Sequence, residues 1–271
     1  MPLRVDDPMT FKQSLAAANR PLAGMWVCSG SPLIAELCAG AGLDWLLIDA
    51  EHSPNGLEGI LAQLQAVGGH AAVPVVRPPA NDTVLIKQYL DLGVRTLLVP
   101  MVDTAADAEA AVAAAHYPPR GVRGVGSALA RASLWNRVPE YLTRASDFVT
   151  VIVQIESVDA VENAEKIAAV DGVDAVFIGP SDLAASMGLL GQQEHPEVVA
   201  AVERTIAAVR SAGKPVGVNA FAEATARRYL AAGVDFILVG ADVALLARGS
   251  EALAATYIRP ESAEPRIEAS Y

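Results

Sequence analysis

The stretch WLLIDAE, residues 45–51, decides the fold class of this chain. It is apolar at consecutive positions from Trp45 to Ile48, which is typical of a strand covered on both faces in a parallel sheet. The segment GAGLD at 40–44 precedes it, and a glycine just beyond a helix commonly provides a left-handed cap. The stretch therefore indicates a helix followed by a buried parallel strand.

This unit recurs along the chain. Eight short apolar runs, at 22–27, 45–51, 73–78, 96–102, 148–156, 175–182, 215–221 and 236–242, are interspersed with alanine-rich segments of helical spacing at 32–41, 57–67, 83–92, 105–115, 160–169, 196–212 and 222–232. Eight strands alternating with helices predict an α/β fold, the (β/α)8 TIM barrel. An open doubly wound sheet is the alternative, but WVCSGSP at 26–32 lacks its glycine-rich first turn.

Size and charge narrow the class of protein further. With 271 residues, 52% of them hydrophobic, we predict a single domain over 1–271, with a core at about 10–257 and a loose tail at 258–271. The formal net charge of −11 disfavours nucleic acid and membrane surfaces as partners. No leader and no apolar run of spanning length is visible, so we expect a cytoplasmic protein.

One connection is unusually long. Residues 117–147 separate a predicted helix from the fifth strand, and the segment carries five arginines and Trp135. Connections of this length are usually functional or disordered. Because it follows a helix, it should begin at the end of the barrel where strands start. A solvated basic flap and a contact between subunits are both compatible with the composition, and we favour the contact.

Polar residues interrupt the apolar runs where the strands end, which is where TIM barrels carry their chemistry. The candidates are Trp26, Asp49, Glu51, His52, Arg77, Gln154, Glu156, Ser181, Asp182, Asn219 and Asp242. An isolated buried charge is costly, so the charged members of this set need partners or a metal ion.

Glu156 and Asp182 follow neighbouring strands, the fifth and the sixth. Two carboxylates there can hold a hard divalent ion, with water and substrate oxygen completing the shell. Mg²⁺ suits such ligands, and Mn²⁺ or Co²⁺ can replace it. The alternative is that both acids pair with arginines.

His52 and Arg77 are the candidates for proton transfer and charge stabilisation. A carboxylate, from Asp49 or Asp91, can orient the imidazole of His52 and make it more basic. Arg77 has a planar fork suited to a carboxylate or enolate oxygen, although a salt bridge to Asp49 or Glu51 is equally compatible. A structural histidine is the alternative for His52.

The few lysines favour metal chemistry over a Schiff base. The four lysines are Lys12, Lys87, Lys166 and Lys214, and none follows the end of a predicted strand. A barrel that activates a carbonyl compound without such a lysine needs another electrophile. We therefore expect a divalent ion and no organic cofactor.

Several motifs together resemble the HpcH/HpaI aldolases, which are metal-dependent class II pyruvate aldolases. They are LLIDAEHSP at 46–54, PVVRPPAND at 74–82, YPPRGVRGVGSALARAS at 117–133, VQIE at 153–156 and VFIGPSDLAASMG at 176–188. The resemblance extends over about residues 10–255. It implies a lyase that cleaves 4-hydroxy-2-oxo acids, such as the 4-hydroxy-2-oxoheptanedioate of aromatic catabolism, to pyruvate and an aldehyde, here succinic semialdehyde.

The resemblance also implies roles for individual residues. Glu156 and Asp182 are expected to bind the metal, and His52 to act as the base, directly or through a metal-bound water. Arg77 is expected to stabilise the enolate, and Asp91 to raise the basicity of His52. The expected substrate-binding residues are Gln154, Ser181 with its backbone, Asp182, Arg77, Trp26 at the end of the first strand, and Val125, which approaches a neighbour's site.

A homo-oligomer is the implied assembly, a hexamer built as a trimer of dimers with exchanged carboxy-terminal helices. Ser181 stands where family members often have alanine, and the seventh strand at 217–223 departs more, which leaves the aldehyde open. Three alternatives remain. One is a 2-keto-3-deoxy sugar acid aldolase, another an acyl-CoA lyase of the citrate lyase type, although no basic groove for its nucleotide is visible. The third is a non-catalytic barrel that binds dicarboxylates.

Overall fold

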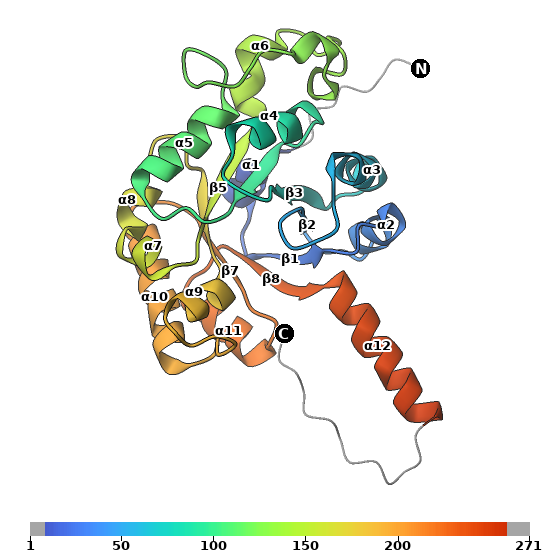
Figure 1. Cartoon of the computed structure of the whole chain (residues 1–271), viewed down its shortest axis with the longest axis vertical. Helices are drawn as coiled ribbons and strands as arrows, with labels where there is room; N and C mark the ends of the chain where they lie inside the picture. The colour runs from blue at the N-terminus through green and yellow to red at the C-terminus, as the bar shows by residue number, and fades with distance from the viewer. Residues whose placement is uncertain (1–8, 259–271) are drawn as a thin grey trace.

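The computed structural model describes residues 9–258, and its eight strands form one closed parallel barrel in the order β1 to β8 (Figure 1). The predicted (β/α)8 barrel is therefore confirmed. The strands are β1 Leu22–Val27, β2 Trp45–Asp49, β3 Val73–Arg77, β4 Thr96–Val99, β5 Thr150–Ile155, β6 Ala175–Ile178, β7 Val216–Asn219 and β8 Phe236–Ala241. Each predicted run contains one of them.

Helices connect the strands around the outside of the barrel. They are α1 Phe11–Ala17, α2 Pro32–Ala39, α3 Leu57–Val67, α4 Thr83–Asp91, α5 Ala105–Ala115, α6 Tyr141–Arg144, α7 Val158–Glu162, α8 Ala164–Ala168, α9 Pro180–Ser186, α10 Pro196–Ser211, α11 Glu223–Ala231 and α12 Asp242–Tyr257. The helix predicted over 160–169 is divided at Asn163 into α7 and α8. All but Ile258 of the tail predicted at 258–271 lies outside the described residues.

The apolar runs are buried on both faces because alternate side chains meet two different cores. Trp45 and Leu47 point into the barrel, whereas Leu46 and Ile48 pack against the helices. Phe11 of α1 joins the inner core, with its ring centroid 5.3 Å from those of Trp45 and Phe236. The helix α1 thus closes the end of the barrel where the strands begin.

The long connection between α5 and β5 is folded against the barrel rather than loose. Its apolar side chains form a small core of Tyr117, Val138, Tyr141, Ala145 and Phe148. Arg123 is buried within it and donates to Asp91 at the end of α4, with 2.7 Å between Nη2 and Oδ1. Because α4 ends where β4 begins, the segment lies at the strand-start end, as predicted.

Within residues 9–258, no helix combines the length and the apolar character needed to cross a membrane.

The inner core predicts a strict need for glycine on β1. A Cβ at Gly24 would lie 2.5 Å from the Trp45 ring, whereas one at Gly240 on β8 meets nothing within 4 Å. Gly24→Ala should lower the free energy of unfolding by roughly 1–3 kcal/mol, the usual cost of overpacking. Thermal melting checks this, with Gly240→Ala as the matched control. Equal melting points for both variants would contradict this packing.

Candidate active site

The polar residues predicted at the strand ends gather at one end of the barrel. Trp26 on β1, Arg77 on β3, Gln154 on β5 and Asn219 on β7 come from alternate strands. Side chains alternate between the two faces of a strand, so every second residue points into the barrel. Leu47 on β2 and Val75 on β3 point inward, and so do Asp49 and Arg77, two places later on the same strands. The last inward position of each strand therefore faces the mouth of the barrel.

Arg77 is held by two acids on the neighbouring strand and loop. Its Nε and Nη2 donate to the two oxygens of Asp49, at 2.8 and 2.9 Å, and its Nη1 lies 2.9 Å from Glu51 Oε2. All three side chains are largely buried. Burial alone would raise the pKa of Asp49, but the Arg77 guanidinium holds that pKa below its usual range. Arg77 therefore forms salt bridges with both Asp49 and Glu51, whereas the sequence left a bridge to one or the other as an alternative role.

Asp49 also shapes the turn that follows β2. Its carboxylate accepts hydrogen bonds from the backbone N–H groups of Glu51 and His52, at 3.1 and 3.2 Å, and from the Ser53 hydroxyl at 3.3 Å. A carboxylate shared between a guanidinium and two amides fixes the turn relative to β3. The position of His52 therefore depends on Asp49.

The imidazole of His52 lies at the open rim, with 66% of its side chain exposed. Its Nε2 is 3.8 Å from Glu51 Oε2, so Glu51 stands between Arg77 and His52. Burial raises the pKa of Glu51; the charges of Arg77 and His52 oppose the rise and those of Asp49 and Asp182 add to it. The sequence indicates Glu51 only as a partner for Arg77, and its contact with His52 is visible only in the structure.

Glu156 is the most unusual charge in the site, because no cation is paired with it among the described residues. It is 2% exposed and accepts from the Met101 N–H at 2.8 Å and from the Gln154 amide. Burial raises the pKa of Glu156 to about 7, and the charges of Asp182 and Glu51 add to the rise. Met101 adopts a left-handed conformation, with φ of 52°, and this small strained turn presents its N–H to the carboxylate.

Asp182 lies in the first turn of α9, directly after β6, and is exposed. Gly179, just before α9, packs against the buried acid, since a Cβ there would lie 2.8 Å from Glu156 Oε2 and 3.0 Å from Gln154 Nε2. This close approach brings β6 and its loop toward Glu156. The structure therefore places Gln154, Glu156, Ser181 and Asp182 on one side of the mouth, although Ser181 is exposed.

Trp26 and Asn219 link the remaining strands to Arg77. The Trp26 indole N–H donates to Asn219 Oδ1 at 2.8 Å, and the Arg77 guanidinium carbon lies 4.4 Å from the centroid of the Trp26 ring. Asp242 has a structural role instead, because its carboxylate accepts from the backbone of Cys28 and Ser29 and so fixes the turn after β1.

Within one chain, Asp91 does not lie beside His52, so it cannot orient that imidazole there. Asp91 ends α4 and pairs with Arg123 at the strand-start end, whereas His52 follows β2 at the opposite end. Val125 is 66% exposed and lies on the same long connection as Arg123. Asp91 lies at the strand-start end because α4 runs back along the barrel and so carries its last residue away from the mouth.

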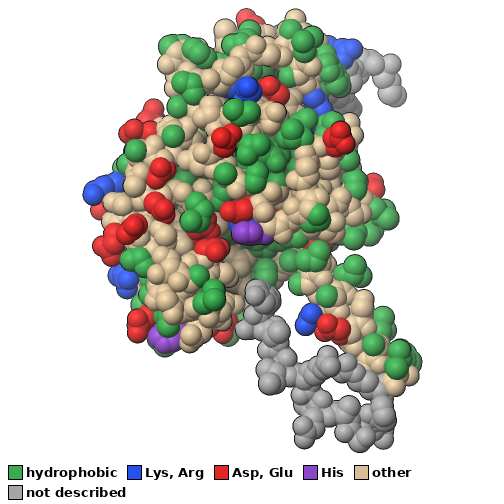
Figure 2. All heavy atoms as spheres, viewed as in Figure 1, with side chains coloured by type: hydrophobic (Ala, Val, Ile, Leu, Met, Phe, Trp, Pro, Cys, Tyr) green, Lys and Arg blue, Asp and Glu red, His purple; other side chains and the backbone are tan. Residues whose placement is uncertain are grey.

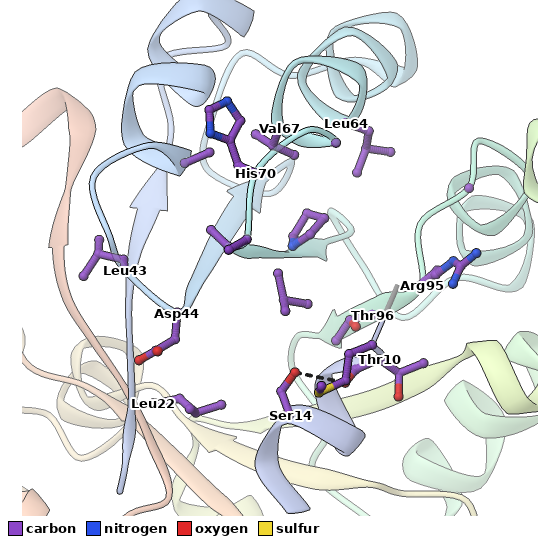
Figure 3. A pocket seen from close by; sticks show the side chains of 18 of the residues that line it. Thr10, Ser14, Leu22, Leu43, Asp44, Leu64, Val67, His70, Arg95 and Thr96 are labelled. Atoms are coloured by element: carbon purple, nitrogen blue, oxygen red, sulfur yellow. Dashed lines mark hydrogen bonds between the residues drawn. The ribbon is translucent and has the colours of Figure 1, made fainter. Parts of the chain in front are cut away.

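A cavity of about 900 Å³ lies at the strand-start end and is distinct from this cluster. Figure 3 shows side chains around it from α1, such as Ser14, from α3, such as Leu64, and from strand starts, such as Leu22 and Thr96. Its acid, Asp44, is engaged by Arg20 at 2.7 Å. The cavity holds none of the residues at the strand ends, and strand starts in such barrels serve stability rather than chemistry.

The chain is also similar to known proteins. The family described as HpcH/HpaI aldolase/citrate lyase matches residues 22–249. The chain belongs to this family. Membership over most of the chain confirms the resemblance seen in the motifs.

Relatives of the chain carry aldolase names. The hydroxypyruvate/pyruvate aldolase of Deinococcus radiodurans is 55% identical over 263 residues, which is 96% of this chain and 95% of that protein. The 4-hydroxy-2-oxo-heptane-1,7-dioate aldolase of Salmonella dublin is 55% identical over 247 residues, 91% and 94% of the two chains. A crystal structure of a family protein from Burkholderia cenocepacia J2315 superposes with a TM-score of 0.87 at 43% identity, covering 90% of this chain and 97% of that one. Together these matches confirm the predicted aldolase class of enzyme.

The raised pKa of Glu156 predicts how stability depends on pH in metal-free protein. Between its ordinary value of 4.5 and about 7, the folded carboxyl binds its proton more tightly than the unfolded one. The contribution of this tighter proton binding to the free energy of unfolding is fully present below pH 4.5. It is lost as the pH rises through 7, and the loss is up to about 3 kcal/mol. Glu156→Gln removes this titration.

The measurement is chemical unfolding in chelator at pH values from 5 to 8. The free energy of unfolding of wild-type protein should fall with pH relative to that of Glu156→Gln. Parallel curves for the two proteins would show that Glu156 ionises normally in the fold.

Proposed function

We propose that this chain is a divalent-metal-dependent pyruvate aldolase that cleaves 4-hydroxy-2-oxo acids, with 4-hydroxy-2-oxoheptanedioate as the first candidate substrate. The observation that carries the proposal is the buried Glu156 carboxylate, unpaired by any cation among residues 9–258, at the mouth that also holds Arg77. An uncompensated buried charge is costly to keep unless a ligand or metal compensates it. A non-catalytic dicarboxylate binder would gain nothing from such a negative site.

The residues present fit a divalent ion. Glu156 and Asp182 would hold it, since the negative charge of Asp182 acts on Glu156 and carboxylate oxygens are ligands that Mg²⁺ and Mn²⁺ prefer. With two carboxylates as its protein ligands, a bound ion would keep positions for water and substrate. The buried Gln154 Oε1 lacks a hydrogen-bond partner, which leaves an acceptor for a bound water or substrate group.

Such an ion, when bound, supplies Lewis-acid polarisation of the 2-oxo group. The chain's own residues do the rest. His52, directly or through an ordered water, takes the proton from the C4 hydroxyl. The C3–C4 bond then breaks, the aldehyde leaves, and the electron pair settles as the enolate of pyruvate.

Arg77 stabilises the enolate oxygen. Asp49 takes one N–H from Nε and one from Nη2, and Glu51 lies against Nη1, so the guanidinium keeps the second N–H of each terminal nitrogen for substrate. The ion pair with Asp49 keeps the guanidinium in place as charge develops on the substrate. A preorganised donor of this kind typically stabilises the transition state by about 3–4 kcal/mol. Protonation of C3 releases pyruvate. Lysine chemistry is not required, because Lys12 and Lys214 donate to the carbonyls of Val149 and Val173 at the strand-start end.

Two details of the substrate remain for assay. One relative's name includes hydroxypyruvate, which favours a second candidate reaction in which hydroxypyruvate replaces pyruvate as the nucleophile. Cleavage of 2-keto-3-deoxy sugar acids is the other alternative. Product analysis with each compound separates the three candidate reactions, because they use the same acidic residues but give different products.

Removing either proposed metal ligand should abolish turnover. Glu156→Gln and Asp182→Asn each delete one carboxylate, and we expect pyruvate release to fall by at least about 10³-fold, as does wild-type activity in chelator. A coupled pyruvate assay with 4-hydroxy-2-oxoheptanedioate and added Mg²⁺ or Mn²⁺ measures this. Glu203→Gln on the outer face of α10 is the control, since it removes only a surface pair with Arg228. Full wild-type activity in chelator would overturn the metal proposal.

We also propose that the chain, as one domain over about 10–257, assembles as a homo-oligomer, a hexamer built from dimers with exchanged carboxy-terminal helices. The helix α12 projects away from the barrel and bears hydrophobic atoms along its length (Figures 1 and 2). Leu245, Leu246 and Leu253 on it are more than 60% exposed, as are Leu33 and Leu37 on α2. A projecting helix gains its stability from packing, so a second copy's α12 over α2 would bury both sets.

The same assembly would restore the role of Asp91. Asp91 and Val125 lie near Arg123 on one exposed side, and Asp91 Oδ2 is 3.8 Å from the position of a Cβ at Gly126. If Val125 approaches the neighbouring copy's mouth, Asp91 approaches it too. We therefore propose that Asp91 acts on the His52 of a second copy.

Mixed oligomers test this arrangement. His52→Ala and Asp91→Asn should each lose at least about 10²-fold in turnover. Co-expression of the two with different tags should recover activity, because some sites then combine an intact His52 with an intact Asp91. Native mass spectrometry gives the assembly state. A monomeric wild type, or doubly tagged oligomers that remain inactive, would contradict the proposal.

A further inference from the structure

The hydrogen bond between Trp26 and Asn219 joins two strands that are not neighbours. In the closed barrel β8 lies between β7 and β1, yet the Trp26 indole N–H reaches Asn219 Oδ1 at 2.8 Å across the mouth. Such a contact adds nothing to the pairing of the sheet. Its effect is on the orientation of the indole ring.

That ring covers the guanidinium of Arg77. The guanidinium carbon is 4.4 Å from the ring centroid, which is within the range of a cation–π contact. Asp49 contacts Arg77 through Nε and Nη2, and Glu51 lies 2.9 Å from Nη1, so both acids hold the guanidinium by its nitrogen atoms. The Trp26 ring restrains the face. Arg77 is therefore fixed in two directions, and the second depends on where Asn219 places the indole.

We infer that Asn219 is a positioning residue for the reaction, which sets the orientation of Arg77 through the Trp26 ring. The inference rests on the proposed function, in which Arg77 stabilises the enolate oxygen. A guanidinium displaced by a fraction of an ångström still binds a carboxylate-bearing substrate but stabilises the developing charge less well. The consequence is a loss in kcat rather than in KM.

The residue type fits this role. An acceptor is needed for the indole N–H, and the mouth already holds the carboxylates of Asp49, Glu51, Glu156 and Asp182. An amide oxygen accepts the hydrogen bond without adding a further negative charge, which would raise the pKa values of these acids. Asn219 is half-buried, so the hydrogen bond is partly shielded from water.

A double-mutant cycle tests the inference. Asn219→Leu removes the acceptor at similar volume, and Trp26→Phe keeps an aromatic ring but removes the N–H. Each should lower kcat for pyruvate release by about three- to tenfold, with KM changed less than twofold, which is the size expected for one lost hydrogen bond. The double variant should be no slower than the slower single variant, because the interaction can be lost only once.

Thr225→Val on α11 is the matched control. Thr225 also follows β7, and the substitution removes its side-chain hydrogen bond to Glu194. The change does not touch Trp26, so kcat should stay unchanged. Melting temperatures within a few degrees of wild type for all variants exclude a loss of fold. Deuterium exchange at C3 of pyruvate, followed by NMR, reports enolate formation without an aldehyde and should fall in parallel with kcat.

The two hypotheses fail differently. A wild type that neither releases pyruvate nor exchanges its C3 protons overturns the proposed function and this inference with it. An active wild type with an equally active Asn219→Leu overturns the inference alone. So does a double variant whose losses multiply, because Asn219 would then act independently of the indole.

Discussion

The bidentate ion pair between Asp49 and Arg77 is the interaction on which the rest of the site depends. It joins the ends of β2 and β3 at the register position where the two residues are paired. The same carboxylate accepts from the backbone of Glu51 and His52, so one buried acid positions a guanidinium, a second acid and an imidazole. Breaking such a pair leaves a buried charge without a partner, which is strongly destabilising. A change at Asp49 or Arg77 therefore also alters the positions of the other residues at the mouth.

Charge compensation is uneven across the mouth. On the side of β2 and β3, Arg77 neutralises Asp49 and contacts Glu51. On the side of β5 and β6, Glu156 is buried with its pKa raised to about 7 by burial. The charge of Arg77 acts on it from a distance, but no described cation forms an ion pair with it. A cation bound there would convert this cost into affinity, since metal binding favours the deprotonated carboxylate. Under the proposed function, this uneven distribution separates the guanidinium that would stabilise the enolate from the carboxylates that would hold a metal.

The two ends of the barrel divide stability from chemistry. The strand starts are closed by Phe11, Trp45 and Phe236, whose rings pack together in tilted and edge-to-face pairs, and the strand ends carry the charges. The long connection and α12 carry exposed apolar side chains, such as Val125 and Leu246, which a monomer leaves in water. Exposed apolar patches often mark protein–protein contacts, and these surfaces support the proposed oligomer in which Asp91 acts on a second copy.

The sequence by itself determined the barrel and most of the residues at its mouth. Runs such as 45–51 are apolar at consecutive positions because both faces of each strand are covered, and polar residues at their ends are costly unless they serve the site. Only the tertiary structure decided how those residues are connected. It placed Glu51 between Arg77 and His52, aimed the Met101 N–H at Glu156, and linked Asn219 to Trp26 over β8. It also moved Asp91 to the opposite end. Strand periodicity fixes which side chains face inward, but contacts between strands depend on barrel closure and helix direction, which no local pattern encodes.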